Sequence, residues 1–288
     1  MTPFGPARGE SWGGMVSEHM LTVSLRDCAG VLDVAAGASP GAPYAAPAFA
    51  RRFADVVRDV QAGAAVAPLR IGIVAQDGPA LDAAVRDAYA RFGRQLAALG
   101  HDCVAVPFPF APREVMQHVV PVIAQNAWAA IEAHGRATGT TALDGLQKTV
   151  QSMVRYAQRM TASDYVRHVN GLHALGRRFA DYLAATGIDL LALPVLAREP
   201  APIGRFGLDW DDYEDYRFGE DSLLQYSPFC PLANATGCLA LALPAGLSPN
   251  GLPLGMQLVA PLGQDDRLLA VGAQYEAAHP WQRYAPGA

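Results

Sequence analysis

The sequence predicts an α/β fold in which a mixed β-sheet is flanked by helices. Residues 69–106 read as strand, helix and strand with short connections, which is typical of a parallel βαβ unit. Residues 238–260 hold two apolar runs separated by turn-forming residues, which favours an antiparallel hairpin. Parallel and antiparallel pairs in one chain predict a mixed sheet. The chain has 288 residues, 51% of them hydrophobic, which is enough to bury a sizeable core.

The first elements along the chain are helical. Apolar residues at helical spacing predict a helix over residues 22–36, with Thr22 as its N-cap and Gly37 after its last residue. A loop rich in proline and glycine follows over residues 38–47. A second helix is predicted over residues 49–60.

The loop contains a formal G-x-S-x-G motif from Gly37 to Gly41, centred on Ser39. A nucleophile elbow needs a strand before the serine and a helix after it. Here a helix precedes the serine and Pro40 follows it in a loop. We therefore interpret the motif as a helix end followed by a turn.

The βαβ unit comes next. An apolar run predicts a strand over residues 69–74, and an amphipathic pattern predicts a helix over residues 80–99 that Gly100 closes. A second strand is predicted over residues 103–106. The crossover between two such parallel strands is expected to be right-handed.

The middle of the chain is mostly helical. Residues 112–186 predict three helical segments, with breaks near residues 135–139 and at Thr161. A buried strand is predicted over residues 188–195. Residues 198–225 form a long loop rich in acidic and aromatic residues, for which a solvated loop and a substrate-facing lid both stay open.

The C-terminal part predicts strand, turn, strand and helix. The apolar runs 238–243 and 252–260 flank Ser248-Pro-Asn-Gly251, in which Asn-Gly tolerates positive φ. A helix then begins near Asp265, because acidic residues suit a helix N-terminus, and Pro280 helps to end it.

Composition and charge exclude several classes of function. A net charge of −5 argues against nucleic-acid binding. No uninterrupted apolar run is long enough to span a membrane. The N-terminus lacks a basic segment followed by an apolar one, and the four cysteines form no C-x-x-C pair. Free thiols in a reducing compartment, the cytoplasm, are therefore expected.

The sequence predicts neither a metal site nor a cofactor. The seven histidines show no H-E-x-x-H or comparable spacing. The acidic segment 209–221 fails the EF-hand pattern, because Tyr213 and Glu214 occupy positions that the pattern reserves for a ligand and a glycine.

Residues 234–281 resemble the C-terminal end of the amidase signature family, the serine hydrolases that cleave carboxamides. The matching pattern is N-x-T-G, P-x-G, G-L-P-x-G-x-Q, D-x-x-L-L and P-W, in that order. Residues 13–44 match a second family segment. Its matching positions are Thr22, Ser24, Arg26, Asp27, Ala29, Leu32, Asp33, Ala36, Gly37, Pro40, Gly41, Pro43 and Tyr44.

The resemblance implies catalysis by a serine, a bridging serine in a cis peptide and a neutral lysine. The G-G-S-S-G-G loop that supplies the bridging serine in the family is missing, since Met15 follows Gly13-Gly14. The one lysine, Lys148, lies on a polar helix face. We therefore expect residues 1–288 to be a single, incomplete amidase domain, with a helical insertion at about 112–186, no catalytic residues and no activity alone.

The resemblance also places the substrate-binding residues. The segment that leads into N-x-T-G borders the substrate cavity in the family, which makes Phe229, Cys230 and Asn234 the candidates. Plain packing and helix capping remain the alternative for all three. Leu239 and Ala242 replace a proline and a serine that the family often has, which puts a polar role of the second position in doubt.

The implied function of the intact protein is hydrolysis of a non-peptide carboxamide without a cofactor. Its partner would be a small-molecule amide, with no nucleic acid and no membrane. The opening segment resembles bacterial amidases of the kind that includes cyclic-dimer nylon-oligomer hydrolases. Two alternatives are open, a non-catalytic binding or scaffold remnant and one half of a split amidase. A homodimer or a complementing N-terminal chain would be the protein partner.

Overall fold

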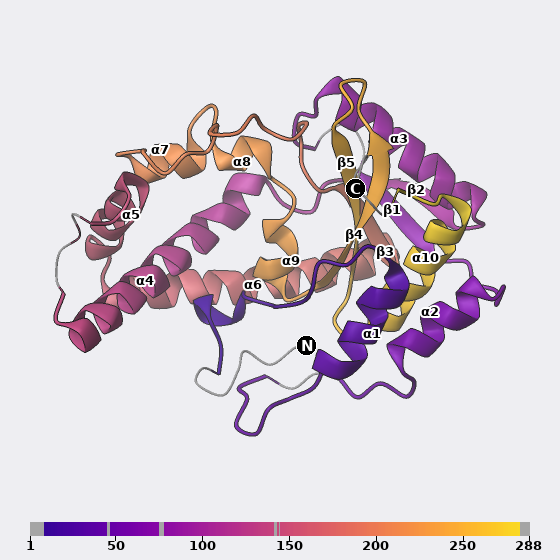
Figure 1. The fold of residues 1–288 in the computed structure, drawn as a ribbon, viewed down its shortest axis with the longest axis horizontal. Coiled ribbons are helices and arrows are strands. Elements are labelled where there is room, and N and C mark those ends of the chain that lie inside the picture. Colours follow the sequence, from indigo (N-terminus) through magenta and orange to yellow (C-terminus); the bar gives the residue numbers. More distant parts are fainter. Residues whose placement is uncertain (1–8, 45–46, 75–77, 141–142, 144, 283–288) are drawn as a thin grey trace.

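The computed structural model describes residues 9–44, 47–74, 78–140, 143 and 145–282. At its centre lies a five-stranded sheet with the order β2-β1-β3-β5-β4 (Figure 1). The strands are β1 (Arg70–Val74), β2 (Asp102–Val106), β3 (Leu190–Pro194), β4 (Leu239–Leu247) and β5 (Pro253–Ala260).

The sheet is mixed, as the sequence predicts. Strand β1 pairs in parallel with both β2 and β3. Strand β5 is antiparallel to β3 on one side and to β4 on the other. Ser248 closes the hairpin between β4 and β5, since its amide donates to Leu252 O at 2.8 Å, and Gly251 sits at a φ of 76°.

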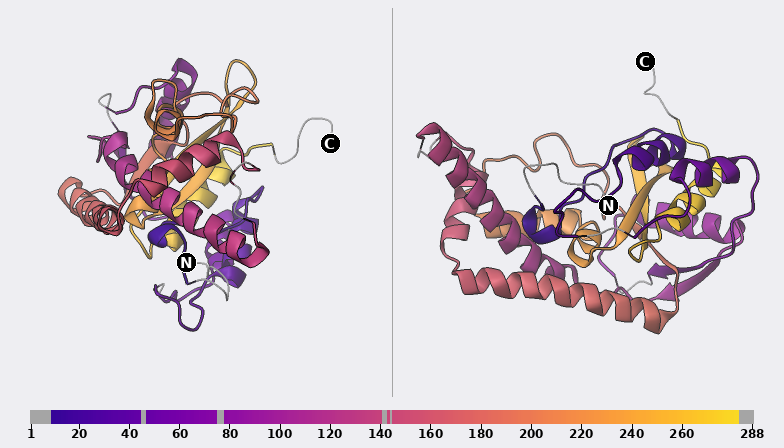
Figure 2. Two further views of the ribbon diagram at one scale, coloured as in Figure 1. Left: turned by 90° about the vertical axis from the view of Figure 1, so that its left-hand side faces the viewer. Right: turned by 90° about the horizontal axis from the view of Figure 1, so that it is seen from below.

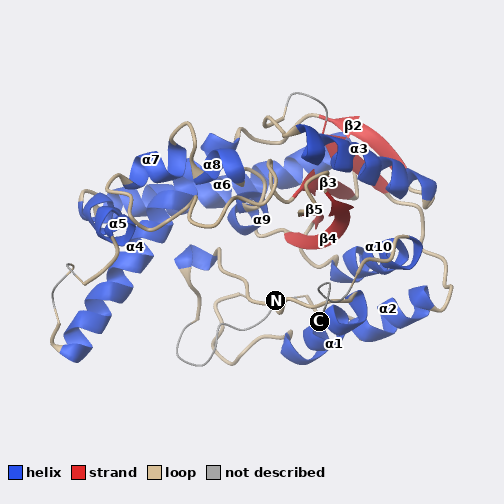
Figure 3. Cartoon of the chain, turned by 45° about the horizontal axis from the view of Figure 1, so that its top comes forward, coloured by secondary structure: helices blue, strands red, loops and turns tan. Residues whose placement is uncertain are grey.

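Helices flank both faces of this sheet (Figure 3). The structure describes a short 3-10 turn, η1 (Trp12–Gly14), and α-helices of four to 27 residues. The α-helices are α1 (Leu25–Ala35), α2 (Phe53–Gln61), α3 (Ala83–Ala98), α4 (Pro112–Thr138), α5 (Lys148–Gln158), α6 (Ala162–Thr186), α7 (Tyr213–Phe218), α8 (Leu223–Tyr226), α9 (Pro231–Thr236) and α10 (Asp265–Ala278).

Two hydrophobic cores lie on opposite faces of the sheet. One core packs α1, α2, α3 and α10 against it, and the other packs α4, α6 and α9. Figure 2 shows α6 running from the helical end of the molecule to the sheet. Strand β3 serves both cores, because Leu190 and Ala192 face the first and Leu191 and Leu193 face the second. Burial on both faces explains its continuous apolar sequence.

Helix α1 begins later than the sequence analysis expects. Its N-cap is Ser24, whose side chain accepts a hydrogen bond from Asp27 N at 3.1 Å, so the assignment of Thr22 as N-cap is wrong. An N-cap side chain accepts from the amide two or three residues after it, and Ser24 has that spacing to Asp27 whereas Thr22 does not. The Leu25 amide donates to Glu276 Oε2 of α10 at 3.1 Å, inside the core.

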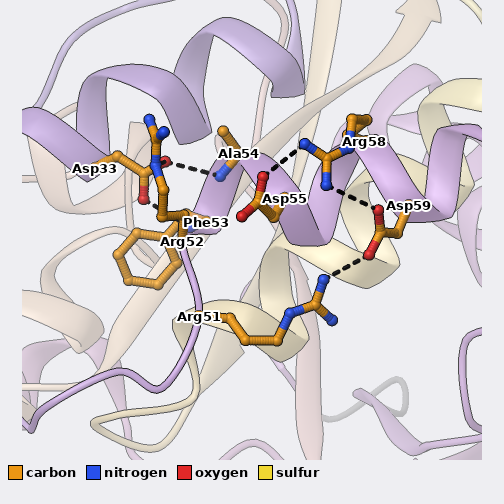
Figure 4. Close-up of polar contacts among 8 residues, drawn as sticks. All are labelled: Asp33, Arg51, Arg52, Phe53, Ala54, Asp55, Arg58 and Asp59. Atoms are coloured by element: carbon orange, nitrogen blue, oxygen red, sulfur yellow. Dashed lines mark hydrogen bonds and ion pairs between the residues drawn. The ribbon is translucent and has the colours of Figure 1, made fainter.

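Helix α2 begins at Phe53 rather than at residue 49. Asp33 of α1 provides its cap, since the carboxylate accepts from Phe53 N at 2.6 Å and from Ala54 N at 3.1 Å (Figure 4). Arg52 lies 3.3 Å from the same carboxylate. A carboxylate at a helix N-terminus satisfies amides that have no partner within the helix. One side chain of the 13–44 segment thus fixes where α2 starts.

The loop predicted over residues 198–225 contains two short helices, α7 and α8, which corrects that prediction. Asp212 starts α7 by accepting hydrogen bonds from Glu214 N at 2.9 Å and Asp215 N at 3.0 Å. Tyr213 and Tyr216 of α7 are buried, so these aromatic side chains attach the segment to the hydrophobic core. Among the helices that the structure describes, none is long and apolar enough to cross a membrane.

Candidate functional site

A groove of about 380 Å³ lies beside strand β4, at the end of the sheet. One wall is the segment Gly14–His19, which connects η1 to α1. The other wall is the C-terminal part of α9 and residues Leu239–Leu241 of β4. Side chains of α10, among them Asp265 and Leu268, close one end. The groove is thus built from both segments that carry the family resemblance.

Asn234 connects the two walls. Its Nδ2 donates a hydrogen bond to Met15 O at 2.8 Å. The helix that carries it ends at Gly237, whose φ of 72° is a conformation that glycine adopts without strain. Asn234 therefore fixes the wall segment to α9, and it also lines the groove.

Phe229 and Cys230 come directly before α9 in the chain and are not among the residues that line the groove. The ring of Phe229 is buried and meets Phe108 edge to face, with centroids 5.8 Å apart. Cys230 Sγ donates to Val195 O at 3.3 Å. Burial raises the pKa of the Cys230 thiol, although contacts with Ser227 and Gln257 lower it, so the thiol is neutral near pH 7. The structure thus places these two candidates together and Asn234 apart from them.

Gln257 is a buried polar residue whose side chain contacts Cys230. Its side chain is 4% exposed, and its Nε2 donates to Pro194 O at 2.9 Å, across from β5 to β3. A buried amide left without a partner would cost free energy, so this bond holds the end of β3 in place. Gln257 belongs to the G-x-Q signature, but its role could not be predicted from that pattern.

The groove also contains a histidine–cysteine pair. His19 Nε2 lies 3.3 Å from Cys28 Sγ. A thiol nucleophile needs its pKa lowered. Burial instead raises the pKa of Cys28, against a hydrogen bond with Thr22 that lowers it. The geometry of a nucleophile and base is present, whereas the electrostatics favour a neutral thiol.

Lys148 and Ser39 do not have the surroundings that a catalytic lysine or serine needs. Lys148 is the first residue of α5, its side chain is 58% exposed, and its Nζ is 3.9 Å from Asp211 Oδ2. Ser39 lies in a turn after α1, in which Ala42 N donates to Ser39 O at 3.0 Å. The interpretation of the G-x-S-x-G motif as a turn is therefore confirmed.

Two histidines of the helical layer face each other away from the groove. His118 of α4 and His168 of α6 have their Nδ1 atoms 3.3 Å apart. Burial lowers the pKa of both rings, and their mutual repulsion lowers that of His168 further. Within the described ranges, no three His, Cys, Asp or Glu side chains lie close enough to hold a metal ion together.

The groove contacts that could not be predicted from the sequence join residues whose spacing follows no secondary-structure period. Asn234 and Met15 are 219 residues apart, and the acceptor is a backbone carbonyl, which no residue pattern marks. His19 and Cys28 are nine residues apart, a spacing with no periodic meaning across a helix start. The only available signal was the family resemblance of both segments.

Comparison with curated proteins identifies close counterparts of the sequence. The chain is 32% identical over 288 residues to the 6-aminohexanoate-cyclic-dimer hydrolase of Paenarthrobacter ureafaciens, a match that covers 95% of this chain and 56% of the relative. A protein of the same name from Pseudomonas sp. (strain NK87) is 32% identical over 284 residues, with the same two coverages. The chain spans about half the length of the curated relatives it matches.

Solved structures show the same fold. The structure of a 6-aminohexanoate cyclic dimer hydrolase superimposes with a TM-score of 0.79 at 31% identity, over 90% of this chain and 54% of that one. A bacterial aryl acylamidase superimposes with a TM-score of 0.72 at 20% identity, covering 90% of this chain and 52% of the other, which supports the fold alone. The model of the family described as Amidase matches residues 14–269, and the chain therefore belongs to the amidase family.

Proposed function

We propose that this chain is part of an amidase that hydrolyses the C–N bond of small, non-peptide carboxamides without a cofactor. The observation that carries the proposal is the 32% identity, over 95% of this chain, to a hydrolase of the 6-aminohexanoate cyclic dimer. That cyclic diamide is accordingly the first substrate to test. Phe229, Cys230 and Asn234 would form part of the substrate wall.

We further propose that residues 1–288 are the later portion of the amidase and lack its Ser-Ser-Lys triad. A lysine can serve as general base only when burial removes its charge. Lys148 is mostly exposed and lies 3.9 Å from a carboxylate oxygen of Asp211. Ser39 lies in a turn, and Met15 stands where the family has a serine. The triad would then lie in polypeptide outside these residues, in the same chain or a separate one.

The remaining expectations accompany this proposal. The chain would form one incomplete domain with a helical insertion at about 112–186, and it would work in the bacterial cytoplasm. The four cysteines are free in the structure, with no disulfide among them, which agrees with a reducing compartment.

A test of this proposal measures turnover and serine reactivity of the purified chain. The chain is incubated with the 6-aminohexanoate cyclic dimer and with a simple arylamide, and amine release is followed. A fluorophosphonate probe reports any activated serine. We expect no turnover and no stoichiometric labelling, with the Paenarthrobacter ureafaciens hydrolase as the positive control. Stoichiometric labelling of one serine would contradict the absence of a nucleophile.

A second candidate is a non-catalytic binding protein built on an amidase remnant. The groove favours it, because a volume of about 380 Å³ falls in the range of small-ligand sites. Isothermal titration with the cyclic dimer separates the two candidates. Tight binding by the chain alone, together with no turnover in any complemented form, would support the binding protein over the amidase.

A further inference from the structure

We propose that His118 of α4 and His168 of α6 form a binding site for a divalent transition-metal ion, Zn²⁺ being the ion that their geometry fits. Water would complete the coordination sphere. The proposal goes beyond the proposed function and does not depend on it, since neither histidine lines the groove beside β4. The bound ion would link the two longest helices of the helical layer.

The spacing of the two rings is the first argument. Their Nδ1 atoms lie 3.3 Å apart, and the ring planes are inclined by 60°. Two nitrogen ligands at about 2.0–2.1 Å from one tetrahedral zinc ion are themselves about 3.3–3.4 Å apart. The two Nδ1 atoms therefore already have the separation of two ligands of one zinc ion. No sequence spacing marks this pair, because the histidines are 50 residues apart on different helices.

Contacts between α4 and α6 hold this spacing from both sides. Arg178 of α6 forms an ion pair with Glu114 of α4, one turn before His118. On the other side, Asn126 Nδ2 of α4 donates to Tyr165 OH of α6 at 3.3 Å. The two histidines thus lie between two cross-helix contacts. Binding to groups that are already in place costs less conformational freedom, which favours the ion.

Gly171 of α6 makes room for the ring of His118. A Cβ at this position would overlap Cε1 and Nδ1 of His118. Glycine weakens a helix relative to alanine, and this glycine lies within a helix of 25 residues. The close approach of the His118 ring explains its presence there. The absence of a side chain at Gly171 therefore lets His118 reach His168.

Both rings have the protonation state and the access that a metal ion requires. Burial lowers the pKa of His118 and of His168, so both imidazoles are neutral near pH 7. Neutral imidazole is a ligand that suits zinc, copper and nickel ions. The rings are only half-buried, so an ion with its water ligands can reach them from solvent.

The neighbouring carboxylates do not complete the site. Glu114 and Asp164 lie four residues before the two histidines, and each forms an ion pair, with Arg178 and Arg167 respectively. Among the residues that the structure describes, no three His, Cys, Asp or Glu side chains form a metal-binding group. Two of the four zinc positions are therefore left to water, and we expect weaker binding than at a closed four-ligand site.

His19 and Cys28 in the groove are the competing pair, with Nε2 and Sγ 3.3 Å apart. A cysteine binds zinc as the thiolate, and burial raises the pKa of the Cys28 thiol. Zinc at this pair would have to displace a proton from the thiol. Zinc at His118 and His168 displaces none, because each neutral imidazole has an unprotonated nitrogen. Near pH 7 this difference favours the histidine pair.

The first experiment measures zinc binding by the full chain of 288 residues without a histidine tag. Isothermal titration with ZnCl₂ at pH 7 gives the stoichiometry and the dissociation constant. We expect one ion per chain and a higher melting temperature in zinc, because an ion that binds only the folded state stabilises it. MgCl₂ should give neither effect, since Mg²⁺ prefers oxygen ligands.

Matched histidine variants locate the ion. His118→Gln and His168→Gln each remove one ligand and should raise the dissociation constant for zinc by about tenfold or more. His134→Gln of α4 and His173→Gln of α6 change exposed histidines of the same two helices. These two control variants should bind zinc like the unmodified chain.

Two further measurements do not depend on the loss of a ligand. Gly171→Ala keeps both histidines but displaces the His118 ring, so the dissociation constant should again rise by about tenfold. Circular dichroism in the presence of a chelator checks that each variant folds. X-ray absorption of the zinc-loaded unmodified chain needs no variant. It should show two imidazoles, with nitrogen and oxygen ligands at about 2.0–2.1 Å and no sulfur at about 2.3 Å.

The outcomes separate the site from its alternatives. No zinc binding, or binding that His118→Gln and His168→Gln leave unchanged, overturns the site and leaves a hydrogen bond between two helices. A sulfur ligand at about 2.3 Å assigns the ion to a cysteine and also overturns it. Equal losses in His118→Gln and His134→Gln would mean unspecific binding by surface histidines. None of these results bears on amide hydrolysis, which the proposed function assigns to groups outside this pair.

Discussion

The two edges of the sheet are built in different ways. Strand β2 has five residues and begins with Asp102, whose carboxylate lies 3.9 Å from Arg70 on the neighbouring strand. Strand β4 has nine residues and no charged side chain, and its residues Leu239–Leu241 line a groove. The β2 edge therefore has the features of a strand edge that is exposed to solvent, a short strand and charged residues. The β4 edge lacks two of these features, since the strand is long and carries no charged residue.

The largest expected effect tests whether β4 is anchored like an interior strand. Leu243→Ala should lower the free energy of unfolding by about 2–5 kcal/mol, because it opens a cavity where the buried leucine side chain packs. Val106→Ala is the counterpart on β2, where the side chain is 5% exposed and smaller. Urea denaturation measures both. A greater loss for Val106→Ala would show that β2 is the better anchored edge and would break the comparison.

A second prediction concerns the packing that holds β4 against the helices. A Cβ at Gly272 of α10 would lie 2.7 Å from Leu241 Cδ2 and 3.1 Å from Leu25 Cδ1. Gly272→Ala should therefore cost about 1–3 kcal/mol, less a helix-propensity gain of up to about 1 kcal/mol.

Gly30 provides the matched control for this change. It lies within α1, and a Cβ there would have no neighbour within 4 Å. Gly30→Ala should raise the unfolding free energy by up to about 1 kcal/mol through helix propensity alone. Thermal melts of both variants give the sign. A stabilising Gly272→Ala would mean that the contact between α10 and β4 is loose.

A third prediction concerns the helix to which the groove wall is attached. Ser24→Ala removes the N-cap of α1 and should cost about 0.5–2 kcal/mol. Thr22→Ala removes the bond of 3.1 Å from its Oγ1 to Ser24 O and the contact with Cys28, but no helix cap, and should cost less. Chemical denaturation of the two variants compares them. Equal losses would show that the cap is shared and that the wall depends on both hydroxyls.

The smallest effect is expected far from both edges, at the start of α6. Asp164 accepts hydrogen bonds from Thr161 N and Oγ1 at 2.8 and 2.7 Å, and these bonds and Arg167 lower its pKa from 3.8 to about 2. A lowered pKa contributes stability above the unfolded value of 3.8, and this is lost as the pH falls through about 2. An acid titration of Asp164→Asn should therefore lack this loss. Asp181→Asn, which changes an exposed carboxylate of the same helix, is the matched control variant.

Much of the fold could be predicted from the sequence because its strongest patterns are local. The hairpin followed from apolar runs around Ser248–Gly251, and the parallel pair from the alternation over residues 69–106. The start of α1 was placed at Thr22 because two hydroxyl residues precede the helix and periodicity does not choose between them. Helices α7 and α8 were missed because six- and four-residue helices show no period.

The candidate site was less predictable because its contacts are long-range. Family resemblance selected Asn234 as a substrate-binding candidate, and this role stays a prediction. The resemblance could not indicate that Asn234 lines the groove or that its hydrogen-bond acceptor is the carbonyl of Met15. The roles of Phe229 and Cys230 in substrate binding stay a prediction. The position of β4 at the edge of the described sheet could not be predicted either, because Leu239–Leu243 has the apolar pattern of a buried strand.

The bond between Leu25 and Glu276 has a consequence for how the chain is made. The two residues are 251 positions apart, so the first long helix finds the partner of its leading amide in the last one. At a synthesis rate of about 5–20 residues per second, about 12–50 s pass between the synthesis of α1 and that of α10. During that interval the Leu25 amide lacks this acceptor, and α1 can pack only against earlier elements such as α2. Helices α4 and α6 are both synthesised within that interval, so the contact between them can form before the one between α1 and α10.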